Sequence, residues 1–245
     1  MTATGYAFRD TLEAAARLGV LAEVFEPASR PFLRELGPRQ AALAYDLGCG
    51  PGFTTRLVAD QLQPRLTVGL DESENFVALA RQNFPDLRFE VHDATRPRLP
   101  AGEGDVIYCR MLLTHLPDYA AALETWARAL LPGGRLLVDE VERIETDEPV
   151  FTEYLAQVTD LLASRGGRLY IGEELDRARP RGLRRLESRA TVHGPDPRAA
   201  AGLFRMNLAV WGPERLELDR DLYRIVRSGG GAITWTMRQI AYERE

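Results

Sequence analysis

Short apolar runs and longer amphipathic segments alternate along the first 141 residues of the chain. Short runs rich in valine, isoleucine and leucine predict strands, and longer segments with helical periodicity predict helices. The predicted strands are residues 43–47, 66–70, 87–91, 105–109 and 135–141, and the predicted helices between them are residues 53–63, 73–83 and 119–131. Strands that alternate with helices favour a mainly parallel sheet covered on both faces. This part of the chain is therefore predicted to be a doubly wound α/β domain.

The flanking segments have different patterns. Residues 9–36 have helical periodicity, and Pro27 and Pro31 are expected to break this segment into short pieces. Beyond Val141 the patterns predict helices over residues 151–164, 197–211 and 213–227 and strands over residues 182–192 and 232–242, the last one antiparallel. We expect the later helices to pack as a cap over the ligand-binding edge of the sheet.

The amino-acid composition excludes several classes of function for this chain. The 245 residues carry a net charge of −5, and 45% of them are apolar, which is ordinary for a globular protein with a large core. All 31 basic residues are arginine, so a catalytic lysine and the lysine of a phosphate-binding P-loop are excluded. The acidic balance also argues against a nucleic-acid-binding protein. We expect a small-molecule ligand and no nucleic acid among the partners.

Cysteine content and targeting signals point to a cytoplasmic protein. Cys49 and Cys109 are too few for a disulfide framework or a zinc cluster. The first ten residues lack the basic and apolar stretches of a signal peptide, and no window of 18 apolar residues predicts a membrane span. We expect a cytoplasmic monomer or homodimer that does not contact a membrane.

The strongest chemical signal is the glycine-rich stretch Asp46-Leu47-Gly48-Cys49-Gly50-Pro51-Gly52 between a predicted strand and a predicted helix. Glycines there allow a tight turn and a close approach of backbone N–H groups to a ligand. The spacing is G-x-G-x-G, which disfavours a nicotinamide dehydrogenase, whose fingerprint is G-x-G-x-x-G. A purely structural turn is the alternative interpretation.

Two acidic residues follow the next two strands. Asp71 ends the second strand, where a carboxylate can accept hydrogen bonds from both hydroxyls of a ribose. Asp93 follows the third strand, where an acid can accept from an exocyclic amine such as that of adenine, and Ala94 offers its backbone N–H. Either aspartate could instead cap a helix. The three features at successive strand ends together favour a nucleoside-containing ligand.

The stretches YDLGCGPG, GLDESENFVALAR, VHDAT, GDVIYCRMLLTHLPD and LLPGGRLLVDE resemble, in this order, those of the class I S-adenosylmethionine-dependent methyltransferases. The more local resemblance is to small-molecule enzymes of the ubiquinone/menaquinone C-methyltransferase-like and trans-aconitate-methyltransferase-like groups. The resemblance implies a Rossmann-like sheet of seven strands with the last one antiparallel. It also implies a single domain, with an N-terminal helical segment (1–40), a cofactor-binding core (41–145) and substrate cap helices with the last strands (146–245).

The resemblance also implies the cofactor and the residues that bind it. S-adenosyl-L-methionine would be held by Tyr6, Asp46, Gly48, Cys49, Gly50, Gly52, Asp71, Glu72, Ser73, Asp93, Ala94, Arg110 and His115. In this scheme the glycines wrap the methionine part, Asp71 holds the ribose, and Asp93 with Ala94 holds adenine. The implied activity is methyl transfer to O, N or C of a small molecule by in-line displacement. A protein of this fold with a non-methylating role, as a cyclase or regulator, is the alternative.

Candidate catalytic side chains are few, because in-line methyl transfer mainly needs alignment in a dry cavity. His115 is the best candidate for a general base, although a capping or packing role is the competing interpretation. His193 could also face the pocket, while Glu140 is expected to be a solvated strand end. Tyr154, Arg205, Asn207 and Trp211 of the cap could meet a substrate, and the surface arginines at 179, 181, 184 and 185 could attract an acidic one. No His/Cys pattern predicts a metal site.

Overall fold

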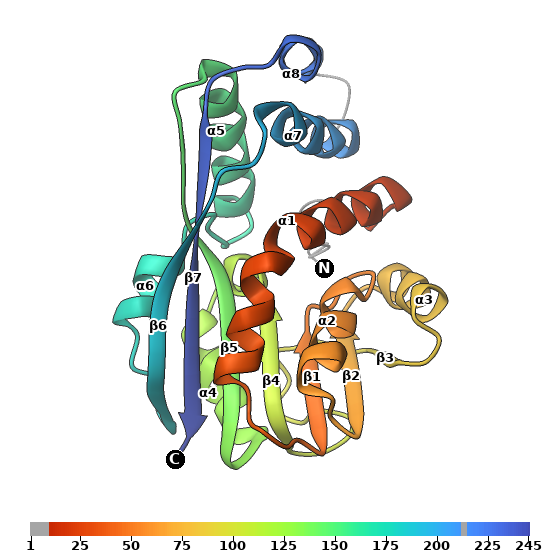
Figure 1. The fold of residues 1–245 in the computed structure, drawn as a ribbon, viewed down its shortest axis with the longest axis vertical. Helices are drawn as coiled ribbons and strands as arrows, with labels where there is room; N and C mark the ends of the chain where they lie inside the picture. The colour runs from red at the N-terminus through yellow and green to blue at the C-terminus, as the bar shows by residue number, and fades with distance from the viewer. Residues whose placement is uncertain (1–9, 212–214) are drawn as a thin grey trace.

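The computed structural model describes residues 10–211 and 215–245, so Tyr6 lies outside the described residues. A seven-stranded sheet in the order β3-β2-β1-β4-β5-β7-β6 runs through the molecule (Figure 1). Its strands are β1 (Leu43–Leu47), β2 (Leu66–Asp71), β3 (Arg88–Val91), β4 (Gly104–Arg110), β5 (Leu130–Thr146), β6 (Leu183–His193) and β7 (Ile233–Arg244). Only β7 runs antiparallel to its neighbours, so the predicted fold class is confirmed.

Helices cover both faces of the sheet, as the alternating pattern predicts. The helices are α1 (Leu12–Leu36), α2 (Phe53–Leu62), α3 (Glu74–Asn83), η1 (Leu113–His115), α4 (Tyr119–Arg128), α5 (Pro149–Ala163), α6 (Gly172–Arg177), α7 (Pro197–Trp211) and α8 (Leu216–Ser228). On one face, Phe32 and Leu33 of α1 pack with Leu57 of α2 against the strands. On the other, Trp126 of α4 and Leu175 of α6 fill the second layer of the core. The short elements η1 and α6 were not predicted from the sequence.

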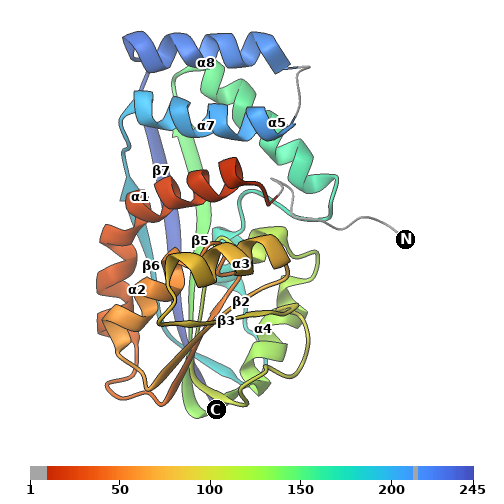
Figure 2. The same ribbon diagram turned by 90° about the vertical axis from the view of Figure 1, so that its right-hand side faces the viewer.

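A third hydrophobic cluster lies beyond the carboxyl edge of the sheet. The ends of β5 and β7 project past the neighbouring strands and stay paired as far as Thr146 and Ile233. They carry α5, α7 and α8, which lie above the sheet in Figures 1 and 2. We call these three helices and the projecting strand ends the cap. Its core joins Phe151 of α5, Phe204 of α7 and Leu222 of α8. The predicted cap is present.

The expectation that Pro27 and Pro31 break the N-terminal segment is wrong. Both prolines lie inside one 25-residue helix, α1, which Figures 1 and 2 show to be bent rather than interrupted. A proline inside a helix removes a backbone donor and bends the axis. Here Phe25, on the cap side of the bend, and Phe32, on the sheet side, are both fully buried. This packing on both sides of the bend stabilises the helix against the cost of the prolines.

Within the described residues, no helix combines the length and apolarity needed to cross a bilayer.

Candidate functional site

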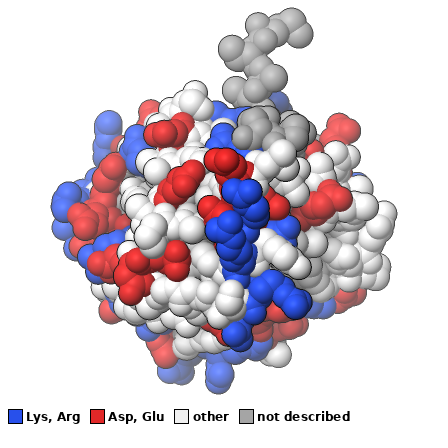
Figure 3. Space-filling view, turned by 90° about the horizontal axis from the view of Figure 1, so that it is seen from above, with Lys and Arg blue, Asp and Glu red and all other residues white. Residues whose placement is uncertain are grey.

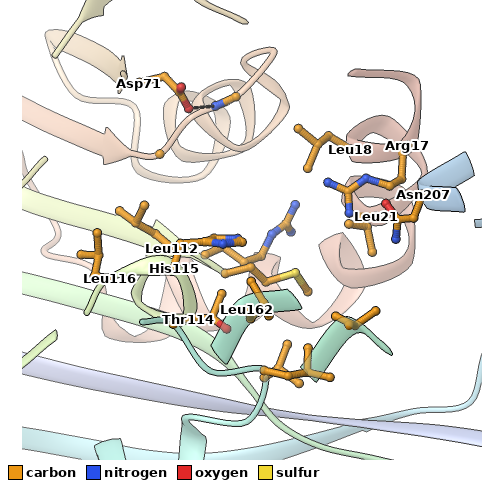
Figure 4. A pocket seen from close by; sticks show the side chains of 18 of the residues that line it. Arg17, Leu18, Leu21, Asp71, Leu112, Thr114, His115, Leu116, Leu162 and Asn207 are labelled. Carbon is orange, nitrogen blue, oxygen red and sulfur yellow. Dashed lines mark hydrogen bonds between the residues drawn. The ribbon is translucent and has the colours of Figure 1, made fainter. Parts of the chain in front are cut away.

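A cavity of about 710 Å³ lies between the carboxyl edge of the sheet and the cap. Its floor is formed by the residues that follow β1, β2, β3 and β4, and its roof by α1, α5 and α7 (Figure 4). Ligands of open α/β sheets bind at this edge, because the strand ends and the loops after them converge there. Of the predicted site residues, those that line the cavity are Gly48, Cys49, Gly50, Asp71, Glu72, Asp93, Ala94, Arg110 and His115.

The glycine loop forms the tight turn that its sequence predicts. Gly48, Gly50 and Gly52 all have positive φ angles of 66°, 52° and 93°. A Cβ atom at Gly52 would lie only 2.9 Å from the rings of Phe84 and Phe89, so both the backbone angle and the space require glycine there. Gly52 itself does not line the cavity; it begins α2 and lets the loop turn sharply into that helix.

Asp46 supports this loop from below. Its side chain is buried, and one carboxylate oxygen accepts hydrogen bonds from the hydroxyls of Thr54 and Thr55, at 2.6 and 2.7 Å. Burial raises the pKa of Asp46 to about 6, although both hydrogen bonds oppose this shift. The other oxygen, Oδ1, has no hydrogen-bond partner in the described structure. Asp46 does not itself line the cavity, so any contact with a ligand there would pass through an intervening group.

Asp71 connects the end of β2 to the glycine loop. One of its carboxylate oxygens accepts from the backbone N–H of Gly50 at 2.9 Å (Figure 4). The other oxygen accepts from the backbone N–H of Ser73, also at 2.9 Å. Burial raises the pKa of Asp71, and the two backbone hydrogen bonds oppose this. A carboxylate has about four lone-pair sites, so each oxygen retains capacity toward the cavity. Ser73 does not line the cavity; its hydroxyl caps α3 and donates to Asp10.

The turn after β3 carries the next predicted pair. Asp93 accepts from both the N–H and the hydroxyl of Thr95, and these hydrogen bonds outweigh burial and lower the pKa of Asp93. The carbonyl of Ala94 accepts from the indole N–H of Trp126 at 2.7 Å. This bond ties the turn to the centre of the core. His92 also lines the cavity, and its buried Nε2 has no hydrogen-bond partner in the described structure.

The turn after β4 is strained and held from beneath. Met111 has a φ of +53°, which is uncommon for a residue with a side chain. Glu140 of β5 accepts from the backbone N–H groups of Leu112 and Leu113, at 2.8 and 2.7 Å. Leu112 in turn lies against Gly48 of the glycine loop. The expectation that Glu140 is a solvated strand end is wrong: its side chain is fully buried, because this turn folds back over it.

Asp139 and Glu140 lie on opposite faces of β5, as strand alternation predicts. Asp139 accepts from Ser29 of α1 at 2.6 Å and from Gln239 of β7 at 3.2 Å. Neither carboxylate lines the cavity. Both therefore organise the site without facing a ligand directly.

Glu140→Gln is expected to make stability less dependent on pH. Burial raises the pKa of Glu140 from 4.5 to about 8, and the charge of nearby Asp139 adds to this increase. The backbone hydrogen bonds from Leu113 and Leu112 act in the opposite direction. Between pH 4.5 and about pH 8, Glu140 keeps its proton in the folded protein but loses it in the unfolded chain. The free energy of unfolding therefore falls as the pH rises through this range. The slope contributed is on the order of 1.4 kcal/mol per pH unit.

Urea unfolding at pH 5, 6, 7 and 8 measures this slope for the wild-type protein and the variant. Glutamine keeps an oxygen for the two backbone donors and carries no titrating proton, so its slope is expected to be shallower. Glu145→Gln is the matched control, because Glu145 lies on the same strand but is exposed and paired with Arg143. Equal slopes in Glu140→Gln and the wild type would contradict the prediction.

His115 lies at the end of η1 and lines the cavity (Figure 4). Burial, and then the positive charges of Arg17 and Arg165, lower the pKa of His115 to about 3. The imidazole is therefore neutral over the physiological range. His193 does not line the cavity; its ring packs edge-on against Phe25, with ring centroids 5.0 Å apart.

The cap residues divide into two groups. Tyr154, Asn207 and Trp235 line the cavity. Arg205 does not; it pairs with Asp219 and lies over the ring of Tyr223. Trp211 also lies outside the lining and stacks on Tyr154. The surface arginines at 179, 181, 184 and 185 do not line the cavity either.

Sequence reasoning missed several cavity residues, which come from segments whose position depends on the tertiary fold. They are Arg17 and Leu18 of α1, Met111 and Leu112 after β4, Arg165 after α5 and Phe204 of α7. The amphipathic pattern of α1 predicted a buried face but not its position over the strand ends. In the described part of the chain, no group of three or more His, Cys, Asp or Glu side chains could hold a metal ion.

Comparisons with known proteins agree with this geometry. Residues 45–138 match the family model described as a methyltransferase domain. A trans-aconitate 2-methyltransferase of Sinorhizobium medicae is 30% identical over 125 residues, which are 51% of this chain and 48% of the relative. The chain spans about half the length of the curated relatives it matches.

Two solved structures share the fold. An S-adenosylmethionine dependent methyltransferase from Mesorhizobium loti has a TM-score of 0.56 and 22% identity, covering 92% of this chain and 100% of the other. Magnesium protoporphyrin IX methyltransferase from Synechocystis PCC 6803, with bound S-adenosylhomocysteine, has a TM-score of 0.52 and 16% identity. The match covers 95% of this chain and 84% of the other. The resemblance stated from the sequence motifs is confirmed.

Proposed function

We propose that this chain, whose residues 45–138 match the methyltransferase domain family model, is an S-adenosylmethionine-dependent methyltransferase acting on O, N or C of a small molecule. The observation that carries the proposal is the connection between the glycine loop and Asp71 on the floor of the cavity. The same residues lie within the segment that matches the methyltransferase family. We further propose a cytoplasmic enzyme that acts as a monomer or homodimer without a nucleic acid or a membrane.

The residues present fit S-adenosylmethionine. The cavity floor provides a glycine loop whose Gly48 and Gly50 line the cavity, and a Cβ on Gly48 would lie 2.9 Å from Leu112, so glycine is required there. Asp71 would hold the ribose hydroxyls, Asp93 and Ala94 the adenine, and Gly48, Cys49, Gly50 and Arg110 the methionine part. Asp46 has a buried oxygen without a hydrogen-bond partner beneath that part. When bound, the cofactor supplies an electrophilic methyl group on a sulfonium.

The chain's own contribution is mainly alignment and exclusion of water. Apolar side chains of the cap enclose the cavity opposite the glycine loop. A dry, shaped cavity that positions two reactants can supply roughly 7–11 kcal/mol of the barrier reduction without a covalent intermediate. The turn held by Glu140 brings His115 to the same cavity, where its neutral imidazole can accept a hydrogen bond from the reacting group of an acceptor.

The mixture of acidic and basic side chains on the cap surface supports a partner other than nucleic acid. Figure 3, seen from above the cap, shows acidic and basic side chains interspersed. In the cap helices α7 and α8, Arg224 pairs with Asp221 at 2.7 Å and Arg205 pairs with Asp219 at 2.8 Å. A nucleic-acid-binding face would instead present a continuous basic patch.

Calorimetric titration with S-adenosylmethionine and, separately, with NAD tests the proposal. We expect micromolar binding of the sulfonium compound and no binding of NAD. A preference for NAD, or no binding of S-adenosylmethionine, would overturn it. Release of S-adenosylhomocysteine in the presence of a panel of small hydroxyl, amine and activated-carbon compounds then separates methyl transfer from a non-methylating role.

His115→Gln is expected to lower turnover by about tenfold, the scale of one lost hydrogen bond to the acceptor, because an imidazole with a pKa of about 3 is too weak a base to take the proton near neutral pH. Because the pKa of His115 is about 3, the wild-type profile of kcat/KM against pH is expected to show no imidazole step between pH 5 and 8. Measuring the two profiles side by side checks both statements. A step in the wild type that disappears in the variant, or unchanged turnover, would contradict the role assigned to this residue.

A further inference from the structure

The cap half of the cavity is walled mainly by apolar side chains. They come from α1, β5, α5 and α7 and include Leu21, Val141, Ile144, Leu155, Val158 and Leu203. Two aromatic rings add a flat surface: Tyr154 stacks on Phe204, with centroids 4.0 Å apart and ring planes 14° apart. Apolar and aromatic walls of this kind bind the body of a small ligand through burial of its apolar surface.

One cation is buried in this half of the site. Arg17 of α1 is 5% exposed and lines the cavity, and Figure 4 shows its side chain beside Asn207 of α7 and away from Asp71. Arg165 lines the cavity from its exposed rim. Acidic side chains that line the described cavity follow β2 and β3 instead, where the ribose and adenine are expected. The two halves of the cavity therefore differ in the charge that they favour.

Two further polar groups line the same half. The indole N–H of Trp235 and the side-chain oxygen of Asn207 are buried, and neither has a hydrogen-bond partner in the described structure. A buried donor or acceptor without a partner costs free energy that a bound ligand can recover. The indole N–H can only donate, so it suits an oxygen of the ligand.

We propose that the methyl acceptor is a monocarboxylate with an apolar, ring-sized body, whose carboxylate binds Arg17 and whose body lies against Tyr154 and Phe204. This rests on the proposed methyltransferase function. The planar guanidinium group matches a carboxylate through two parallel hydrogen bonds, and such charge-assisted bonds are strong when water is excluded. Arg110 is assigned to the cofactor end, because it is the last residue of β4 beside the glycine loop and lies close to the buried network of Ser29 and Asp139.

The same walls disfavour a polycarboxylate. With one carboxylate on Arg17, a further carboxylate placed on the ligand body, away from the rim where Arg165 lies, would lie against leucine, isoleucine and valine side chains. Burial of a charge in such surroundings is strongly unfavourable. The curated relatives include trans-aconitate 2-methyltransferases, but trans-aconitate carries three carboxylates. We therefore expect this chain to differ from those relatives in its acceptor.

The test uses calorimetry on the full chain saturated with S-adenosylhomocysteine. The probes are 3-phenylpropanoate, its neutral amide 3-phenylpropanamide, and trans-aconitate. We expect the monocarboxylate to bind at least about tenfold more tightly than either of the other two. Failure of S-adenosylhomocysteine to bind at all would overturn the proposed function itself. Normal binding of S-adenosylhomocysteine with no preference for 3-phenylpropanoate would overturn only the acceptor assignment.

Substitutions of Arg17 identify the residue responsible. Arg17→Met is expected to remove the preference for the acid over its amide while leaving the affinity for S-adenosylhomocysteine unchanged, and Arg17→Lys is expected to keep part of the preference. Arg30→Met is the matched control, because Arg30 lies on the same helix but is exposed and paired with Glu26. Circular dichroism confirms that each variant is folded. A preference that survives in Arg17→Met, or an equal loss of S-adenosylhomocysteine binding, would overturn the assignment.

Discussion

Asp71→Ala is expected to weaken the binding of S-adenosylmethionine by about 10²-fold, the scale of losing one or two charge-assisted hydrogen bonds. Two effects add. The variant loses the carboxylate proposed to hold the ribose hydroxyls, and it also frees the N–H of Gly50, which Asp71 fixes at 2.9 Å. The glycine loop would then lose the contact that ties it to the end of β2. Calorimetric titration of the purified variant measures the loss.

Two controls separate these effects. Asp71→Asn keeps an oxygen for one backbone donor, so its loss of affinity is expected to be smaller than that of the alanine variant. Asp86→Ala removes an exposed carboxylate that pairs with Arg56 outside the cavity, and it is expected to bind the cofactor as the wild type does. Wild-type affinity in Asp71→Ala would show that this carboxylate does not hold the cofactor.

Trp126→Ala is expected to destabilise the protein by about 3–5 kcal/mol, because removal of a fully buried tryptophan leaves a large cavity in the core. Trp126 packs between α4 and the sheet and also donates its indole N–H to the carbonyl of Ala94. The effect is therefore expected to reach the turn that carries Asp93. Urea unfolding followed by circular dichroism measures the change in the free energy of unfolding.

The variant Trp126→Phe separates the contribution of packing to stability from that of the indole hydrogen bond. Phenylalanine retains most of the apolar volume and lacks the N–H, so the expected cost is about 1–2 kcal/mol. Cofactor affinity should fall in this variant as well, since the turn after β3 loses its tie to the core. An alanine variant that unfolds with wild-type stability would contradict the central packing role of this residue.

The positions of the strands and the glycine loop could be predicted because they depend on local patterns. Each parallel strand is a short apolar run, and the G-x-G-x-G spacing directly determines where the backbone turns. The cofactor half of the site follows from these strand ends. The prediction failed for α1, where Pro27 and Pro31 have strong local effects that are outweighed by burial of Phe25 and Phe32 against partners distant in the sequence.

Burial of Glu140 and the position of Arg17 could not be predicted for the same reason. Glu140 is charged and lies near the end of the predicted strand, which ordinarily indicates exposure to solvent, but the turn after β4 folds over it. Arg17 lies on a helix that the sequence places before the core, and only the tertiary fold brings it to the cavity. The single-domain organisation and the roles of the individual site residues stay predictions.

The register of β6 and β7 has a consequence for how the specificity of this protein can change. His193 pairs with Trp235, so the chain leaves the sheet and re-enters it on adjacent strands, and α7 and α8 are in effect one long hairpin loop. This excursion also shares its buried core with α5 and with Phe25 of α1, so a replacement that restores those contacts can leave the pairing of β6 and β7 unaltered. It brings Leu203, Phe204 and Asn207 to the cavity but none of the predicted cofactor contacts. Exchange of this loop is thus a route by which the proposed methyl-donor site could acquire new acceptors.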